Sequence, residues 1–260
     1  MKVTAVLLNY ARPDNMPEQI EALKREPDVE KILLLNGRPS TKLNIDGVEC
    51  LEDFDMNEKY GSGRRWLVDL DKVPSDVILF MDDDKVLAPG NLQQLQQELQ
   101  EGKKMAGYIG RTCDANGYDR FLKKNNSVLT PVLMVEKQAV REYQKAFHKY
   151  AATLEKRHGN GEDLAFNHFF RNHYKMRPAL VKFKNAPKKL QERESYSGKR
   201  GHMSQRNAYC KELKELSTAY DTTEPLNTTG IAVISVLSFL LLVLLIVMFK
   251  NARRGVNFIR

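Results

Sequence analysis

Apolar runs of strand length recur along the first third of the chain. Three of them, at residues 2–9, 31–35 and 76–81, are dominated by apolar side chains. Strands that are buried on both faces, as in a parallel sheet, have this pattern, so we predict that all three belong to one such sheet. A shorter run at residues 48–51 predicts a further strand.

The pattern changes to a helical period between and after these runs. Leu92, Leu95 and Leu99 are spaced by three and four residues, which is typical of an amphipathic helix. The predicted helices cover residues 16–25, 61–70, 91–101, 139–157 and 207–219, one more opens at Glu162, and further strands are predicted at 105–109 and 128–135. Strands that alternate with helices predict an α/β fold.

The C-terminal part has a different pattern. Residues 230–249, GIAVISVLSFLLLVLLIVMF, contain no charged side chain. Twenty residues of helix span a hydrocarbon core of about 30 Å, and a helix that is apolar on every face is not typical of a soluble protein. We predict a single transmembrane helix here, so that a lipid bilayer would be a partner. Residues 1–221 would form the folded domain, 222–229 a linker and 250–260 a short basic tail.

Charge is distributed unevenly along the 260 residues, whose net charge is +8. Residues 1–100 carry 12 basic and 19 acidic side chains, whereas residues 101–229 carry 25 basic and 14 acidic ones. An acidic half that can hold a cation, beside a basic half that can hold an anion, suits a metal–phosphate ligand. No glycine-rich aromatic motif interleaves the basic residues, so we expect no nucleic-acid partner.

Polar clusters follow three of the predicted strands, at residues 9–12, at Asn36 and at residues 82–84. In open α/β sheets, ligands collect beyond the carboxyl ends of the strands. The third cluster, in ILFMDDDKVL, has three adjacent carboxylates that repel one another, and a bound cation would remove the repulsion. Carboxylate oxygens suit Mn²⁺ or Mg²⁺, which complete their shells with water and phosphate oxygens. The cluster therefore predicts a metal–diphosphate site.

Four segments together resemble the exostosin-like transferase domain of glycosyltransferase family 64. They are VTAVLLNYARPDNM, ILFMDDDKVL, GEDLAFNHFF and YSGKRGHMSQRNAYC. They occur in the family's order and span nearly all of the chain before the predicted linker. The resemblance implies a GT-A fold, which is Rossmann-like with a mostly parallel central sheet flanked by helices. It also implies an enzyme that takes a sugar from a nucleotide-sugar.

The resemblance assigns a group of residues to the donor's nucleotide. Leu8 and Arg12 match positions that meet the base and ribose at the end of the first strand. Asn36 matches a polar contact to the base. An arginine on the donor would be Arg64 or Arg65, with Asn57 nearby.

Further positions match residues around the diphosphate. Asp82 and Asp83 would contact the sugar or ribose, and Asp84 would ligate Mn²⁺ or Mg²⁺. Arg206 matches an arginine that closes onto the diphosphate, and His202 matches a donor-side histidine. A divalent cation and a guanidinium stabilise the negative charge that develops when a sugar–diphosphate bond breaks.

The resemblance places the catalytic carboxylates in GEDLAFN. Asp163 matches the family's active-site aspartate, and Glu162 stands beside it. A carboxylate there can stabilise the oxocarbenium character of the anomeric carbon. The family is retaining, so the expected route is front-face attack by the acceptor hydroxyl. Whether Asp163 acts as a nucleophile, a base or an electrostatic brace stays open at this point.

The sequence departs from the family at one cysteine. The family typically has a cysteine directly before the acidic pair, which bonds to the late cysteine, but Gly161 stands there. The chain's three cysteines are also too few and too scattered for a disulfide framework. We therefore expect Cys210 to lack a partner, which is typical of a reducing compartment. This favours a C-terminally anchored protein with a cytosolic catalytic domain, and the ER or Golgi lumen is the alternative.

These features predict a metal-dependent, retaining glycosyltransferase of EC class 2.4 that moves a hexose or an N-acetylhexosamine. The donor would be a UDP-sugar, and the acceptor a glycan or glycoconjugate. Two other hypotheses are open. One is a metal-dependent phosphohydrolase that uses the strand-end aspartates in a permissive D-x-D-x-[TV] pattern. The other is a catalytically inactive, tail-anchored binding protein of the same fold.

Overall fold

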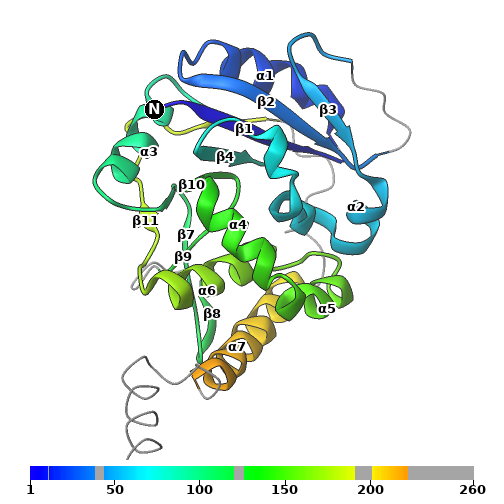
Figure 1. Cartoon of the computed structure of the whole chain (residues 1–260), viewed down its shortest axis with the longest axis vertical. Coiled ribbons are helices and arrows are strands. Elements are labelled where there is room, and N and C mark those ends of the chain that lie inside the picture. The colour runs from blue at the N-terminus through cyan, green and yellow to red at the C-terminus, as the bar shows by residue number, and fades with distance from the viewer. Residues whose placement is uncertain (11, 39–43, 120–125, 191–200, 222–260) are drawn as a thin grey trace, which may run out of the picture. The chain divides into compact units, whose positions relative to one another are not determined.

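The computed structural model describes residues 1–10, 12–38, 44–119, 126–190 and 201–221. Its centre is a seven-stranded sheet with the order β11-β6-β10-β4-β1-β2-β3 (Figure 1). The strands of this sheet are β1 (Val3–Asn9), β2 (Val29–Asn36), β3 (Glu49–Glu52), β4 (Val77–Met81), β6 (Met105–Gly107), β10 (Val132–Glu136) and β11 (Ala179–Leu180). Two small sheets join β5 (Lys85–Val86) to β12 (Lys188–Lys189), and β7 (Gly110–Asp114) to β8 (Gly117–Asp119) and β9 (Ser127–Val128).

The central sheet is mostly parallel, as the apolar runs predict. β1 pairs in parallel with both β2 and β4, and β2 with β3. β10 runs antiparallel to both of its neighbours, β4 and β6. Every residue of β1 and of β4 is buried, because helices cover both faces of the sheet.

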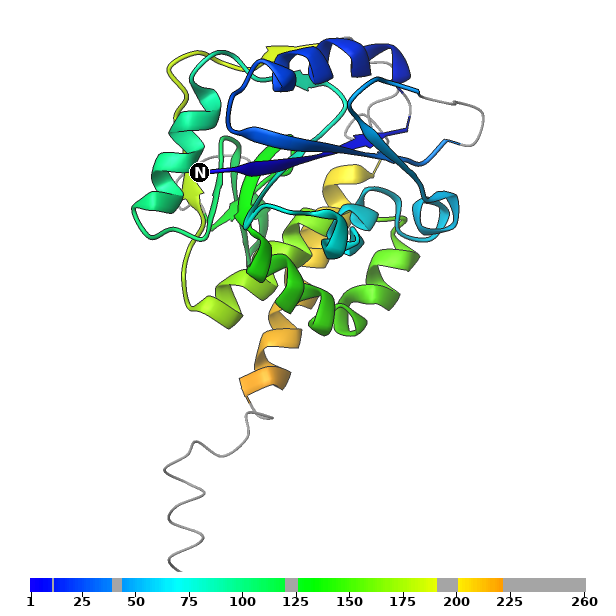
Figure 2. The same cartoon turned by 45° about the horizontal axis from the view of Figure 1, so that its top comes forward.

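The helices divide between the two faces of the sheet, as Figure 2 shows. Their bounds are α1 (Met16–Lys24), α2 (Phe54–Tyr60), α3 (Asn91–Gln100), α4 (Lys137–Ala146), α5 (His148–Lys156), α6 (Glu162–Tyr174) and α7 (His202–Asp221), with short 3₁₀ turns at Pro13–Asn15, Gly61–Leu67 and Leu70–Lys72. Helices α1 and α3 share one apolar core with alternate residues of β1, among them Leu7. On the other face Trp66 stacks on Phe166 of α6, with ring centroids 3.9 Å apart, and packs against Phe80 of β4.

Two predicted helices differ from the structure, and one helix and one hairpin of the structure were not predicted. The helix predicted at 139–157 is two helices, α4 and α5, because the Phe147 N–H donates to the carbonyl of Gln144, only three residues back. The segment predicted as a helix from Gly61 is a 3₁₀ turn that follows the unpredicted helix α2. The hairpin of β7 and β8, which carries few large apolar side chains, was not predicted either.

Residues 1–214 form one compact unit, and a second unit begins at Glu215. Within the described part of the chain, no helix is long and apolar enough to cross a membrane. The predicted linker at 222–229, the transmembrane helix at 230–249 and the basic tail all lie outside the described residues.

Candidate active site

The polar clusters that follow β1, β2 and β4 meet at one edge of the sheet, as their positions predict. The strands are parallel, so their carboxyl ends share this edge, and Asn9 stands opposite Asn36 in the register. Both asparagines are fully buried, and the Asn9 side-chain amide donates to the side-chain oxygen of Asn36 at 2.9 Å. Asn36 thus helps to hold the ends of β1 and β2 together.

Each carboxylate of the aspartate triplet has a basic partner from the chain itself. The three pairs are Asp82 with Arg65 (2.6 Å), Asp83 with Arg12, and Asp84 with Lys85 (2.8 Å). The repulsion within the triplet, which we expected a bound cation to remove, is thus already relieved by three side-chain cations of the chain itself. Arg12 and Arg65 come from distant segments, so the sequence around the triplet does not reveal them.

The second and third aspartates differ in how their oxygens are satisfied. Burial raises the pKa of Asp83 to about 6, and Arg12 opposes that rise. Asp84 gives its Oδ2 to the Lys85 ammonium, while its Oδ1 is buried and has no hydrogen-bond partner among the described residues. A buried carboxylate oxygen without a donor is unfavourable, so a second cation bound at this oxygen would stabilise the Asp84 carboxylate.

A single guanidinium joins the triplet to the acidic pair of α6. Arg65, which is 2% exposed, donates to Asp82 and lies 3.6 Å from the Glu162 carboxylate. Glu162 also accepts from the Thr130 hydroxyl at 3.3 Å. Burial, followed by the like charge of Asp163, raises the pKa of Glu162 to about 7. The structure thus brings together two motifs that are eighty residues apart in the sequence.

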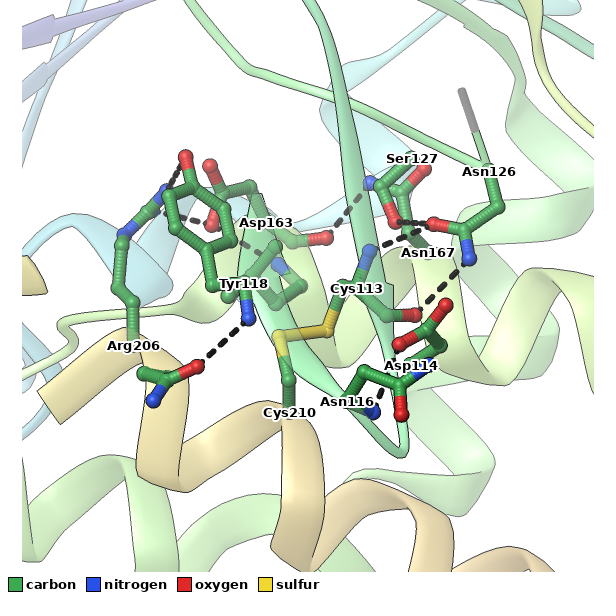
Figure 3. Close-up of a disulfide and its surroundings, with 12 residues drawn as sticks. Cys113, Asp114, Asn116, Tyr118, Asn126, Ser127, Asp163, Asn167, Arg206 and Cys210 are labelled. Carbon is green, nitrogen blue, oxygen red and sulfur yellow. Dashed lines mark hydrogen bonds and ion pairs between the residues drawn. A yellow bond between two sulfur atoms is a disulfide. The ribbon is translucent and has the colours of Figure 1, made fainter. Parts of the chain in front are cut away.

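Asp163 is held by an arginine from the last helix. Arg206 donates to Asp163 at 2.5 Å, and their side chains are 8% and 3% exposed. Figure 3 shows Tyr118 of β8 against the same guanidinium, and its hydroxyl accepts from Arg206 at 3.0 Å. Burial alone would lower the pKa of Arg206, but the charge of Asp163 raises it above its ordinary value. Arg206, which we assigned to the diphosphate, therefore binds a carboxylate here.

A disulfide fixes the helix that carries Arg206. Cys210 lies one helical turn after Arg206 and is bonded to Cys113 of β7 (Figure 3). The prediction that Cys210 lacks a partner was therefore wrong. The prediction rested on the glycine at position 161, where the family has a cysteine. The actual partner, Cys113, lies 97 residues before Cys210 in the sequence. The Cys113 backbone is itself bracketed by the Asn126 side-chain amide, through two hydrogen bonds of 2.9 Å.

Arg64 lies under the loop that follows β2. Its Nη2 donates to the Leu35 carbonyl at 2.6 Å, while its Nε and Nη1 have no partner among the described residues. A Cβ on Gly37 would come within 1.8 Å of Arg64 Nη1 and 2.6 Å of the Asn57 Cγ. Gly37, Arg64 and Asn57 are thus in close contact, and burial lowers the pKa of Arg64 to about 10.

The two remaining predicted residues lie at the ends of elements. Leu8 is buried near the end of β1, and the half-buried His202 begins α7, one turn before Arg206. The first part of the YSGKRGH motif, up to residue 200, lies outside the described residues.

Sequence reasoning missed four residues that complete the site. They are Lys85, Thr130, Tyr118 and Cys113. Lys85 directly follows the triplet, so its position was a usable signal. Nothing in the local sequence connects the other three to their partners, because those contacts span 32, 88 and 97 residues.

The family model for the glycosyl transferase family 64 domain matches residues 3–239. The chain belongs to this family. The resemblance seen in the four motifs is thereby confirmed, and the family supports a glycosyltransferase over the phosphohydrolase hypothesis. No curated protein sequence matches the chain.

Three solved structures illustrate what this family 64 protein is similar to. The mannosyltransferase PcManGT from Pyrobaculum calidifontis, in complex with GDP-Man and Mn²⁺, has a TM-score of 0.51 at 9% identity over 93% of this chain and 80% of its own. The 2-C-methyl-D-erythritol 4-phosphate cytidylyltransferase of Francisella tularensis has a TM-score of 0.48 at 13% identity, over 74% of this chain and 95% of its own. TarS of S. aureus has a TM-score of 0.43 at 14% identity, over 64% of this chain and 34% of its own. The mannosyltransferase shares the fold of this chain, which is all that 9% identity shows.

The residues of the family 64 domain can be tested for their fit to a divalent cation. No group of three or more His, Cys, Asp or Glu side chains in the described ranges is arranged to hold a metal ion. Asp84, in the turn between β4 and β5, nevertheless offers one buried oxygen that has no hydrogen-bond partner among the described side chains and backbone. Mg²⁺-type sites commonly use one or two carboxylates and complete the shell with phosphate oxygens and water. The donor set therefore fits a cation that is shared with a diphosphate.

Proposed function

We propose that this family 64 protein transfers a sugar from a UDP-sugar to a hydroxyl of a glycan or glycoconjugate, with retention at the anomeric carbon and with Mn²⁺ or Mg²⁺ on Asp84. The moved sugar is a hexose or an N-acetylhexosamine. One observation carries the proposal: Arg65 contacts both Asp82 and Glu162, so the triplet and the acidic pair belong to one site.

The leaving group determines what the cationic side of the site must do. When the sugar–phosphate bond breaks, negative charge develops on the diphosphate, and a divalent cation on Asp84 supplies positive charge where it develops. Arg206 contributes a guanidinium fork that matches phosphate oxygens. In the structure this fork donates to Asp163. We expect the donor to compete for Arg206 and so to leave Asp163 free to face the sugar.

The acidic side of the site stabilises the opposite charge. Asp163 and Glu162 open α6 side by side, and both are almost fully buried. As the anomeric carbon becomes electron-poor, the ionised Asp163 carboxylate stabilises it electrostatically. The raised pKa of Glu162 lets it carry a proton near neutral pH, so that the pair need not hold two negative charges. This division supports an active enzyme over an inactive binding protein.

Arg64 is the residue that we expect to donate hydrogen bonds to the nucleotide. Its Nε and Nη1 lie buried at the ends of β1 and β2, and the part of the chain that the structure describes offers them no acceptor. A buried guanidinium N–H without an acceptor is unfavourable, so a ligand oxygen that accepts from it contributes favourably to binding. A pyrimidine base or ribose oxygen at this edge would supply that acceptor, and Arg12 and Asn36 border the same edge.

The direct test is a panel of nucleotide-sugars with the full-length chain, with and without Mn²⁺. Release of UDP from one UDP-sugar only when metal is present, increased by a glycan acceptor, would support the proposal. Release from a GDP-sugar alone would change the donor but keep the reaction. An absence of turnover with every donor, despite tight metal-dependent nucleotide binding, would favour the inactive binding protein. Phosphate release from simple monoesters would favour the phosphohydrolase.

We also propose that the chain is anchored in a membrane by residues 230–249, with the catalytic domain in an oxidising lumen. The disulfide between Cys113 and Cys210 supports this side of the membrane, because disulfides persist in secretory compartments and are rare in the cytosol. It removes the cysteine argument that favoured a cytosolic domain. Protection of the large domain from protease in sealed vesicles would support the lumen, and its digestion would restore the cytosolic assignment.

A further inference from the structure

Lys85 occupies one oxygen of the carboxylate that we propose as the metal ligand. Its ammonium lies 2.8 Å from Asp84 Oδ2 and 3.3 Å from the Asp84 backbone carbonyl. The other carboxylate oxygen, Oδ1, is buried and lacks a hydrogen-bond partner among the described residues. One oxygen of the Asp84 carboxylate therefore binds the Lys85 ammonium, and the other is available to a metal ion.

The backbone around this contact is held from two sides. Gln19 of α1 donates to the Lys85 carbonyl at 2.5 Å and to the Asp82 carbonyl at 2.6 Å. Directly after β12, the Leu190 N–H donates to the Asp84 carbonyl at 2.9 Å. The Lys85 and Asp84 side chains are only 11% and 14% exposed. The ammonium is thus placed against Asp84 by fixed main chain, unlike an ion pair between two long side chains at the surface.

The other two aspartates are neutralised as well, by Arg65 and Arg12. The triplet therefore has no excess negative charge to attract a dication. A diphosphate would bring that charge, because its oxygens carry two or more negative charges at neutral pH. Metal and diphosphate should then enter together, each raising the affinity for the other, since such coupling is reciprocal.

We propose that Lys85 is a positioning residue that keeps the metal affinity of the donor-free protein low, so that the metal binds with the donor diphosphate. This inference rests on the proposed function, in which Asp84 holds the cation. A single and a double positive charge about 5 Å apart repel each other enough to change the affinity about tenfold, even at the dielectric constant of water.

The test measures Mn²⁺ binding by the full-length chain without any donor, by electron paramagnetic resonance of free Mn²⁺. Lys85→Met keeps the side-chain length and removes the charge, so we expect Mn²⁺ affinity to rise about tenfold. Lys85→Arg keeps the charge and should stay within about twofold of the wild type. Lys188→Met removes the same charge from β12, which pairs with β5, and should also have little effect, because Lys188 pairs with Glu18 instead.

A second readout is the affinity for UDP, by calorimetry, with and without Mn²⁺. At saturating Mn²⁺, the metal should strengthen UDP binding more in the wild type than in Lys85→Met, because only in the wild type does the diphosphate charge offset the repulsion between Lys85 and the metal. An unchanged or lower Mn²⁺ affinity in Lys85→Met would overturn the inference alone. Absence of Mn²⁺ binding by every variant, with and without UDP, would overturn the metal-dependent function as well. A tenfold rise with no UDP binding would support the inference and overturn only the choice of nucleotide.

Discussion

Arg206 and Asp163 form a buried ion pair of 2.5 Å between the last helix and the start of α6. Both side chains are more than nine-tenths buried, so neither charge can turn to water if the other is lost. Breaking such a pair from one side typically costs about 3–5 kcal/mol, because it leaves an uncompensated charge inside the protein. The pair therefore contributes to the stability of the domain through two residues that we propose act on the donor.

The first prediction concerns this pair. Arg206→Met should lower the free energy of unfolding by about 3 kcal/mol, whereas adding Asp163→Asn to it should restore part of the loss, because no charge is then left unpaired. Urea unfolding of the two single variants and the double variant measures the coupling. Additive effects in the double variant would show that the two groups do not interact.

The second prediction concerns the disulfide. Cys113→Ser should lower the free energy of unfolding by roughly 4 kcal/mol, because the bond closes a loop of 97 residues in the unfolded chain. It should also weaken nucleotide binding, since α7 carries Arg206. The matched control is Cys50→Ser, which removes the free cysteine and should have little effect on either quantity. Equal thiol counts before and after reduction of the unfolded wild type would contradict the bond itself.

The third prediction concerns pH. Glu162 has its pKa raised from 4.5 to about 7, so the folded state holds a proton that the unfolded state releases between these values. The stability that depends on this proton is present below pH 4.5 and is lost as the pH rises to about 7. Glu162→Gln should remove this dependence, so its stability relative to the wild type should grow between pH 5 and 8, by on the order of 2 kcal/mol. Glu155→Gln, at an exposed glutamate, should show no such trend.

The fourth prediction concerns Gly37. An alanine there would place its Cβ 1.8 Å from Arg64 Nη1, so the guanidinium would have to move. We expect Gly37→Ala to weaken nucleotide binding at least tenfold, and Arg64→Lys to weaken it similarly, because lysine lacks the planar set of N–H groups. Calorimetric titration with UDP would measure both. If Gly37→Ala binds UDP as the wild type does, Arg64 is not part of the nucleotide site.

The sheet edge was predictable because it follows from short patterns. The apolar runs before Asn9, Asn36 and Asp82 place these residues at the carboxyl ends of parallel strands, and such ends meet at one edge in any α/β sheet. The composition of the edge could therefore be predicted from the sequence without knowledge of any tertiary contact.

The pairing within the edge was not predictable in the same way. The sequence shows three adjacent aspartates but not that Arg12 and Arg65, from other segments, come to lie against them. The partner of Cys210 likewise depends on the hairpin of β7 and β8, whose strands are short and lack a clear apolar alternation. Long-range contacts of this kind are set by how the elements pack, and no local pattern records them.

The account depends most directly on the Asp84 carboxylate as the point where a divalent cation meets the donor. The measurement that tests it is the rate of UDP release from the preferred UDP-sugar by the full-length chain as Mn²⁺ is varied. Asp76→Asn, at the opposite end of β4, serves as the control because Asp76 is exposed and precedes the strand. We predict that the wild type and Asp76→Asn turn over only with metal, and that Asp84→Asn loses at least a hundredfold in rate. Equal metal-dependent rates in Asp84→Asn and the wild type would contradict the account.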